Sequence, residues 1–276
     1  MKQNKIVQII LSFIGVLIII LIAGKIFLSI QFTKEVKRLY SYPNIICKNR
    51  FNYSQLTNLP DPVQNYFKHV LKEGQPYINY IRLLHDGEFK TGEGKDWVNI
   101  KGEQYYTTQK PGFIWKGKTL LFTARDMYVA DKGNLVVSLF SVFDVVNGHG
   151  EKYDQGELLR WLGESVWFPT NLLPNKNLQW EPIDNLSAKL TFKYNGINLF
   201  YIVKFNNAGE ITQLETKRYM GEKDLETWIG KLSNYTKING VLVPTNIEAI
   251  YKLKKEDYSY AKFHVKRIEY DKPLRF

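Results

Sequence analysis

The sequence predicts a mainly β (α+β) protein, in which one N-terminal transmembrane helix precedes a large curved antiparallel sheet with two or three covering helices. Three observations predict this fold: an uncharged apolar run over residues 6–24, alternating apolar and polar side chains beyond residue 78, and two amphipathic segments, one before the alternation and one within it. We expect a membrane anchor (1–30), a stalk or linker (31–58) and one β-rich soluble domain (59–276).

The apolar run has the length of a membrane-spanning helix. At about 1.5 Å per residue, 19 residues span roughly 28 Å, close to the hydrocarbon thickness of a bilayer. Every face of the run is apolar, whereas a soluble helix keeps a polar face. The run is longer than the core of a signal peptide, and its end, LIAGK, lacks an A-x-A cleavage pattern. We therefore predict an uncleaved signal anchor that contacts the lipid bilayer through residues 6–30.

Charges on the two sides of the anchor bear on its orientation. Lys2 and Lys5 precede the run, and Lys34, Lys37 and Arg38 follow it. The positive-inside comparison is therefore nearly balanced. Because a tail of five residues usually stays inside, we expect a single-pass protein of the cell membrane, with the large C-terminal domain outside the cytoplasm in the bacterial envelope.

Composition argues against several function classes. The net charge is +11, but basic residues are interspersed with acidic ones, so we expect a solvated surface beside an anionic membrane and no nucleic-acid partner. Cys47 is the single cysteine, so no intrachain disulfide and no cysteine-based metal site can form. The four histidines lack metal-ligand spacing. We expect neither a metal nor a cofactor.

The first soluble element is an amphipathic helix. Asp61 is expected as its N-cap, Pro62 as its first residue, and Gly74 as its end. Apolar side chains at helical spacing form one stripe: Val63, Tyr66, Phe67, Val70 and Leu71. This helix should cover one face or end of the sheet.

Residues 78–146 alternate and turn repeatedly, with one turn around Asp131-Lys132-Gly133, and predict several antiparallel strands. Within them, residues 112–119 match the formal P-loop pattern G-x-x-x-x-G-K-[ST]. The interior of this match is bulky, and LLFTA follows it, so no helix N-terminus is available for a phosphate. We expect no nucleotide partner.

A second helix follows these strands. Asp154 and Glu157 form an N-terminal signature, and Pro169 ends the segment. Its apolar stripe consists of Leu158, Leu159, Leu162 and Val166.

Charged residues of this second helix allow two interpretations. Glu157, Arg160 and Glu164 are spaced for an exposed salt-bridge ladder. Alternatively, Arg160 and Glu164 form a partly buried pair that lines a cleft beside the neighbouring aromatic residues Trp161, Trp167 and Phe168. The burial of Glu164 distinguishes the two.

The C-terminal third predicts a meander of long strands. Asn195-Gly196 and Asn239-Gly240 are strong hairpin signals, and further turns are expected over residues 206–209 and 254–257. One face of such a sheet should be buried or face a ligand.

Several segments together resemble an uncharacterised bacterial family, a membrane-anchored domain of unknown function. They are LPDPVQNYFKHVLKEG, PGFIW, GELLRWLGESVWFPTNLL, LQWEPIDNLSAKL, TWIG and GVLVPTNIEAIYKL, within residues 59–270. The block R-x-L-x-E-x-x-W-F-P, from Arg160 to Pro169, is the most specific of these. The resemblance implies a distant, fold-level likeness to the half-barrel carriers of lipid and lipoprotein, and it supplies no catalytic residues.

We predict a non-catalytic binding module for an apolar or lipid-like ligand, because a helix-covered sheet rich in aromatic side chains leaves an apolar cleft. The expected ligand-binding residues are Trp115, Arg160, Trp161, Glu164, Trp167 and Phe168. Two alternatives stay open. One is an envelope structural or protein-interaction domain that pairs through strand edges. The other is an enzyme that uses Glu164 or a nearby carboxylate.

Overall fold

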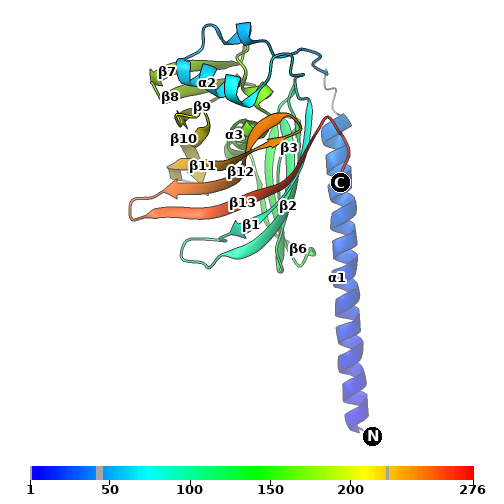
Figure 1. The fold of residues 1–276 in the computed structure, drawn as a ribbon. Coiled ribbons are helices and arrows are strands. Elements are labelled where there is room, and N and C mark those ends of the chain that lie inside the picture. Colours follow the sequence, from blue (N-terminus) through cyan, green and yellow to red (C-terminus); the bar gives the residue numbers. More distant parts are fainter. Residues whose placement is uncertain (1, 42–45, 222–223) are drawn as a thin grey trace.

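A computed structural model describes residues 2–41, 46–221 and 224–276, and within them thirteen strands form one antiparallel sheet (Figure 1). The sheet order is β6-β5-β4-β3-β2-β1-β13-β12-β11-β10-β9-β8-β7. The predicted fold class is confirmed. The strands are β1 (Tyr80–Phe89), β2 (Val98–Thr107), β3 (Gly112–Lys118), β4 (Phe122–Val129), β5 (Lys132–Leu139), β6 (Phe143–His149), β7 (Leu178–Asp184), β8 (Ser187–Tyr194), β9 (Ile197–Phe205), β10 (Ile211–Met220), β11 (Asp224–Ile238), β12 (Val241–Lys252) and β13 (Asp257–Tyr270).

The described helices are three α-helices and three short 3₁₀ segments. They are α1 (Lys2–Ser41), α2 (Asp61–Val70), α3 (Glu151–Glu164), η1 (Tyr53–Leu56), η2 (Ser165–Trp167) and η3 (Pro169–Leu172).

The sheet consists of two meanders joined by one long-range pairing. Strands β1 to β6 follow one another, as do β7 to β13, and β1 pairs with β13 to join the two sets. The chain between the meanders forms α3, which contacts strands of both and lies inside the curve of the sheet (Figure 1). Polar residues on the concave face are therefore brought together from distant parts of the sequence.

Turn chemistry explains the hairpins. Asn195-Gly196 and Asn239-Gly240 have positive φ at both positions, as a type I′ turn requires, and both predicted hairpins are confirmed. The turn expected around Asp131-Lys132-Gly133 lies one residue earlier, at Ala130 and Asp131, so Lys132 already belongs to β5.

Helix α2 covers one end of the sheet, where it contacts β8 and β12. Its predicted apolar stripe is buried, but its predicted boundaries are wrong. Pro60 is the N-cap, Asp61 is the first helical residue, and the helix ends at Val70 because Leu71 is extended. The carboxylate of Asp61 still lies in the first turn, where the helix dipole favours negative charge.

Helix α3 begins three residues before the predicted signature. Gly150 is its N-cap, and Asp154 lies inside the helix. The carboxylate of Asp154 is buried and accepts hydrogen bonds from the Gly133 backbone N–H (2.7 Å) and from Lys132 (3.0 Å). Asp154 therefore fastens α3 to the start of β5 and does not cap the helix.

Helix α1 has two parts that differ in their surroundings. The large apolar side chains of residues 6–22 are exposed, and over Lys5–Ser41 the helix is apolar and long enough to cross a membrane. From Gly24 onward, one stripe packs on the outer face of the sheet: Gly24, Leu28, Phe32, Val36 and Leu39. An ion pair between Glu35 and Arg125 of β4 reinforces this contact.

The predicted stalk is not a free linker over its described residues. Residues 31–41 continue α1 along the sheet, and η1 begins with an Asn52 capping box. Phe51 and Leu56 are each 1% exposed and belong to the main core. The packed unit therefore begins before residue 59. Residues 42–45 of the predicted stalk and residue 1 of the predicted anchor lie outside the described residues.

Candidate ligand-binding site

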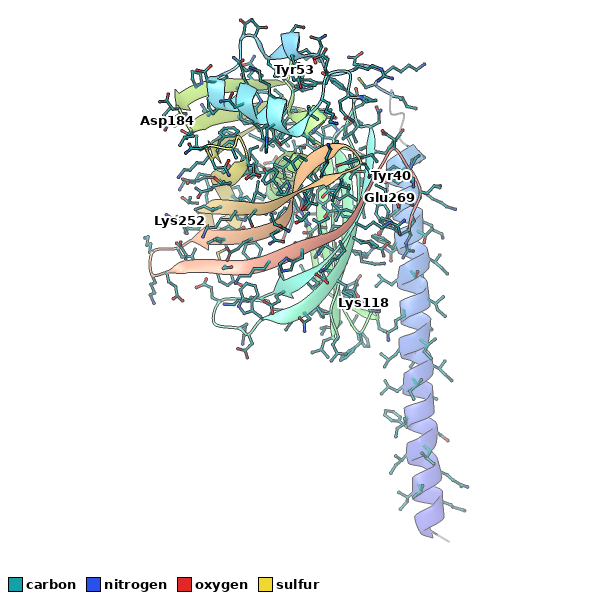
Figure 2. All side chains as sticks on the ribbon, in the orientation of Figure 1. Tyr40, Tyr53, Lys118, Asp184, Lys252 and Glu269 are labelled. Carbon is teal, nitrogen blue, oxygen red and sulfur yellow. The ribbon has the colours of Figure 1, made fainter. Side chains whose placement is uncertain are left out.

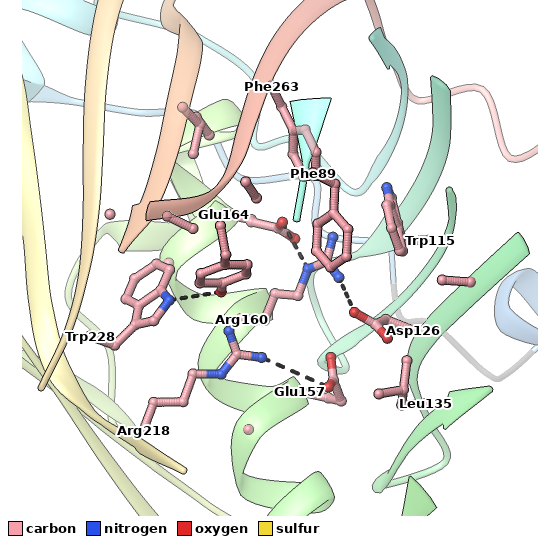
Figure 3. A pocket seen from close by; sticks show the side chains of 18 of the residues that line it. Phe89, Trp115, Asp126, Leu135, Glu157, Arg160, Glu164, Arg218, Trp228 and Phe263 are labelled. Atoms are coloured by element: carbon pink, nitrogen blue, oxygen red, sulfur yellow. Dashed lines mark hydrogen bonds and ion pairs between the residues drawn. The ribbon is translucent and has the colours of Figure 1, made fainter. Parts of the chain in front are cut away.

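A cavity of about 580 Å³ lies between α3 and the concave face of the sheet (Figure 3). Its walls are mainly apolar and aromatic, and include Phe89, Trp115, Leu135, Trp228, Ile247 and Phe263. This volume falls within the range of roughly 300–1,000 Å³ that is typical of small-molecule sites.

Small side chains create the space. Gly230, Ala249 and Ala261 lie side by side across β11, β12 and β13, and all three line the cavity. A well-packed interior would place large side chains at such inward positions. Ala249 and Ala261 therefore leave room between the sheet and α3, whereas the space beside Gly230 is occupied by the ring of Trp228.

Arg160 organises the polar floor of the cavity. Its Nε donates to Glu164 Oε1 (2.9 Å), and its Nη1 pairs with Asp126 of β4. The side chains of Arg160 and Glu164 are 12% and 16% exposed, so the exposed-ladder interpretation is wrong and the partly buried pair is correct.

Glu164 is held by three donors. Besides Arg160, Gln104 Nε2 (2.6 Å) and the Tyr106 hydroxyl (3.1 Å) both donate to Glu164 Oε2. Desolvating an ionised carboxylate is costly unless hydrogen bonds replace the lost water. These bonds supply that replacement and fix α3 against β2.

Arg218 of β10 is the second cation at the floor. Within the described part of the chain its one ion pair is with Glu157, at 3.9 Å, and no hydrogen bond reaches its guanidinium. The Arg218 side chain is 17% exposed and lines the cavity, near the ring of Trp228. Figure 3 shows Arg218 and Glu157 facing each other below Arg160. The donors of Arg218 are thus available to a ligand.

Glu157 is a buried carboxyl group with a raised pKa. Burial, reinforced by the neighbouring charge of Asp126, raises the pKa of Glu157 from 4.5 to about 8. Its Oε2 has no hydrogen-bond partner among the described residues. The environment of Glu157 therefore favours the neutral form of its carboxyl group, and its contact with Arg218, at 3.9 Å, is a long one.

A buried imidazole positions one aromatic wall. Trp115 Nε1 donates to His85 Nε2 (2.7 Å), and burial lowers the pKa of His85 to about 4. His85 is therefore neutral at physiological pH, with Nε2 free of a proton so that it can accept. This bond holds the indole of Trp115 against the cavity.

Four of the six predicted site residues meet at this cavity: Trp115, Arg160, Glu164 and Trp167. Trp161 does not line it. Its indole donates to the Thr107 carbonyl (2.9 Å) and borders a second, more polar pocket. Phe168 is fully buried in the core against Tyr106 and lines neither pocket. A helix presents its side chains on opposite sides, so neighbours of Arg160 in sequence need not share its environment.

Arg218 was missed by sequence reasoning, although a signal was present. On β10, Leu214, Thr216 and Arg218 fall at every second position, and the first two are buried. Period-two alternation therefore places Arg218 on the inner face. A cation at an inward position is a stronger indication of a site than a cation in a charged stretch.

The protein is therefore a curved antiparallel sheet that encloses one helix and a cavity large enough for a small ligand. The chain belongs to a family of unknown function, DUF6544, whose profile matches residues 49–263. The resemblance to a family of unknown function, predicted from the sequence, is confirmed.

Two solved structures are similar to this chain. An outer membrane lipoprotein-sorting protein domain from Vibrio parahaemolyticus has a TM-score of 0.41 and 8% identity, and the match covers 71% of this chain and 87% of that one. A LolA superfamily protein from Nitrosomonas europaea has a TM-score of 0.37 and 13% identity, with 78% and 92% covered. No curated protein matches this chain.

Proposed function

We propose that this protein is a membrane-anchored, non-catalytic binding module for a single lipid-like amphiphile, with its large domain outside the cytoplasm. The observation that carries the proposal is the cavity, which combines apolar walls with a cation at its floor, Arg218, whose guanidinium makes no hydrogen bond within the described residues. An amphiphile has the same two parts, an apolar chain and a polar head.

The walls suit an acyl chain. Each methylene group that leaves water for an apolar surface contributes about 0.8 kcal/mol. Aromatic rings such as Trp228 and Phe263 provide broad, rigid contact area for such a chain.

The floor suits an anionic head. A guanidinium forms two parallel hydrogen bonds with a carboxylate or phosphate, and such charge-assisted bonds are stronger than neutral ones. Arg160 is already occupied by Asp126 and Glu164, whereas Arg218 is not hydrogen-bonded within the described chain. The head of the ligand should therefore contact Arg218.

The first half of α1 supports the membrane part of the proposal. Its large apolar side chains from Ile6 to Ile22 are exposed, apart from the half-buried Leu21, and none of them is buried. A helix that is apolar all round is stable in lipid and unfavourable in water.

Lipid content tests the cavity directly. Full-length protein purified in detergent should retain bound lipid, measured as moles per mole of protein by mass spectrometry after extraction. Ala249→Trp and Ala261→Trp fill the cavity and should each lower this ratio. Ala208→Trp places the same side chain on an exposed turn and should leave the ratio unchanged. Because all variants keep α1, lipid bound to the anchor cancels in the comparison. Equal lipid content in all four proteins would overturn the proposal.

A second measurement tests the head group. A fluorescent fatty acid should bind Arg218→Met about tenfold more weakly than wild type, since a hydrogen bond to a charged group contributes about 1.5–3 kcal/mol. The corresponding fatty alcohol should bind both proteins equally. Arg267→Met, on an exposed part of β13, is the matched control. Equal loss of acid and alcohol binding would mark Arg218 as structural.

A further inference from the structure

Two neighbouring hairpin tips expose an unusual set of large apolar side chains. The β3–β4 turn carries Leu120 and Leu121, and the β5–β6 hairpin carries Phe140 and Phe143. Leu120 is 94% exposed and Phe143 64%. The tips are joined, because the Phe140 N–H donates to the Leu121 carbonyl (2.8 Å). Together, residues 119–121 and 139–146 form what we call the apolar lip.

We propose that the apolar lip lies in the surface layer of the bilayer that α1 enters, so that the cavity opens directly onto the membrane. This inference rests on the proposed membrane anchoring and deepens it. A soluble surface rarely concentrates exposed apolar side chains without a partner, and lipid is the partner that the position of the lip favours.

The position of α1 places the lip at the membrane boundary. A Cβ atom at Gly24 would lie 2.6 Å from Val142 Cγ2 and 2.8 Å from the Ser141 carbonyl oxygen, so the helix and the lip approach as closely as a glycine allows. Gly24 is also the last residue of the apolar run that begins at Ile6. When residues 6–24 cross the hydrocarbon layer, Ser141 and Val142 must lie at its edge.

Backbone conformation at the lip is unfavourable for its residues. Phe140 and Ser141 have φ values of 52° and 63°, the left-handed region in which Asn and Gly are preferred. Strained conformations of this kind are often retained at functional sites. An exposed aromatic ring at the tip of a hairpin suits the interfacial layer of a membrane, where aromatic side chains are enriched.

Basic residues flank the lip. Lys25 follows Gly24, and Lys118 precedes Leu120 by two positions. Figure 2 labels Lys118, at the lower end of the sheet. Lys118 lies directly opposite Lys101 in the β2–β3 pair, and both are exposed. Like charges at paired positions repel each other, and a layer of anionic lipid head groups would relieve that repulsion.

The lip is continuous with the cavity. Leu139 and Val146 belong to the exposed surface of the lip and also line the cavity, next to Phe122. A lipid that moves along these side chains would pass from bilayer to cavity without exposing its chains to water.

Depth-dependent quenching tests the inference. The full chain, with Cys47→Ser to remove its single cysteine, is reconstituted in nanodiscs that contain anionic lipid and, in parallel samples, lipids with a spin label near the head group or in the middle of the acyl chain. A fluorophore is attached to one introduced cysteine at a time: Leu120→Cys or Phe143→Cys in the lip, Leu186→Cys in the β7–β8 turn, and Ile18→Cys inside the apolar run. Leu186 is 45% exposed and lies near the opposite edge of the sheet, so it is the matched control.

We expect several-fold stronger quenching at Leu120→Cys and Phe143→Cys than at Leu186→Cys. Quenching at Ile18→Cys alone, with none at the lip, would overturn the inference while preserving the anchor. Absence of quenching at Ile18→Cys by the acyl-chain label would instead overturn the proposed anchoring. Efficient disulfide crosslinking of Leu120→Cys between two copies, without lipid quenching, would assign the lip to self-association and also overturn the inference.

Discussion

The two ends of the curved sheet have opposite character. At the closed end, α2 packs its buried side chains Val63, Tyr66 and Phe67 against β8 and β12. At the open end, the sheet surrounds the cavity and finishes in the apolar lip. Both ends belong to the same thirteen-stranded sheet within the described residues. The difference shows that strand alternation builds the scaffold, whereas side-chain size decides whether its interior is filled.

Turn residues differ between the ends in the same way. Asn239-Gly240 at the closed end and Phe140-Ser141 at the open end both adopt positive φ. The first pair is the sequence that this backbone favours, and the second is not. The Phe140-Ser141 turn is therefore strained, as is the Ala130-Asp131 turn at the other end of β5.

Large-to-small substitution at the two ends should have unequal consequences. Phe67→Ala, at a fully buried position, should lower the free energy of unfolding by about 3–5 kcal/mol. Phe89→Ala, beside the existing cavity, should cost less than half of that, because its ring already lacks neighbours on one side. Urea unfolding in detergent measures both. Equal losses would show that the open end is packed as tightly as the closed end.

Disrupting the polar floor of the cavity should cause the next largest loss in the free energy of unfolding. Arg160→Met leaves the carboxylates of Asp126 and Glu164 buried without their cation and should cost about 3 kcal/mol in the same assay. Arg267→Met on the exposed face should change stability by less than about 0.5 kcal/mol. A small loss in Arg160→Met would mean that water reaches the floor of the open end freely.

The pH dependence of stability should report Glu157. Its pKa is about 8 in the folded state and near 4.5 when unfolded, so the folded state binds the extra proton between these values. Stability is therefore highest below pH 4.5 for this group and falls as pH rises towards 8, by at most about 1.4 kcal/mol per pH unit.

The window from pH 6.5 to 8 isolates this effect. His85, whose pKa falls from 6.5 to about 4 on folding, gives the opposite slope below pH 6.5. Unfolding measured at pH 6.5, 7.2 and 8 should show declining stability in wild type and a flatter profile in Glu157→Gln. Parallel profiles would contradict the protonated state of Glu157.

The smallest expected effect concerns the strained turn. The double variant Phe140→Asn, Ser141→Gly should raise stability by about 0.5–1 kcal/mol, because it supplies the residues that a type I′ turn favours. The same variant should weaken spin-label quenching at Leu120→Cys, since the aromatic ring no longer contacts lipid. Unchanged quenching would separate the strain at Phe140 from membrane contact.

Sequence patterns predicted the elements better than their contacts. Alternation and Asn-Gly turns located the hairpins, and helical spacing identified the buried stripe of α2. Strand β7 was not singled out, since Pro182 weakens a strand pattern and is tolerated because β7 lies at the sheet edge. Of the six residues predicted to bind a ligand, Trp115, Arg160, Glu164 and Trp167 line the cavity, while Trp161 and Phe168 face elsewhere. Ligand binding by these residues stays a prediction.

The sequence by itself determined an apolar helix of membrane length and a β-rich domain, because periodicity and turn chemistry are local properties of a chain. Only the tertiary structure decided that α1 continues along the sheet, that Arg218 from β10 meets Glu157 from α3, and that the lip touches Gly24. These contacts join residues far apart in the chain. They depend on how the two meanders curve around α3, and no local pattern encodes that curvature.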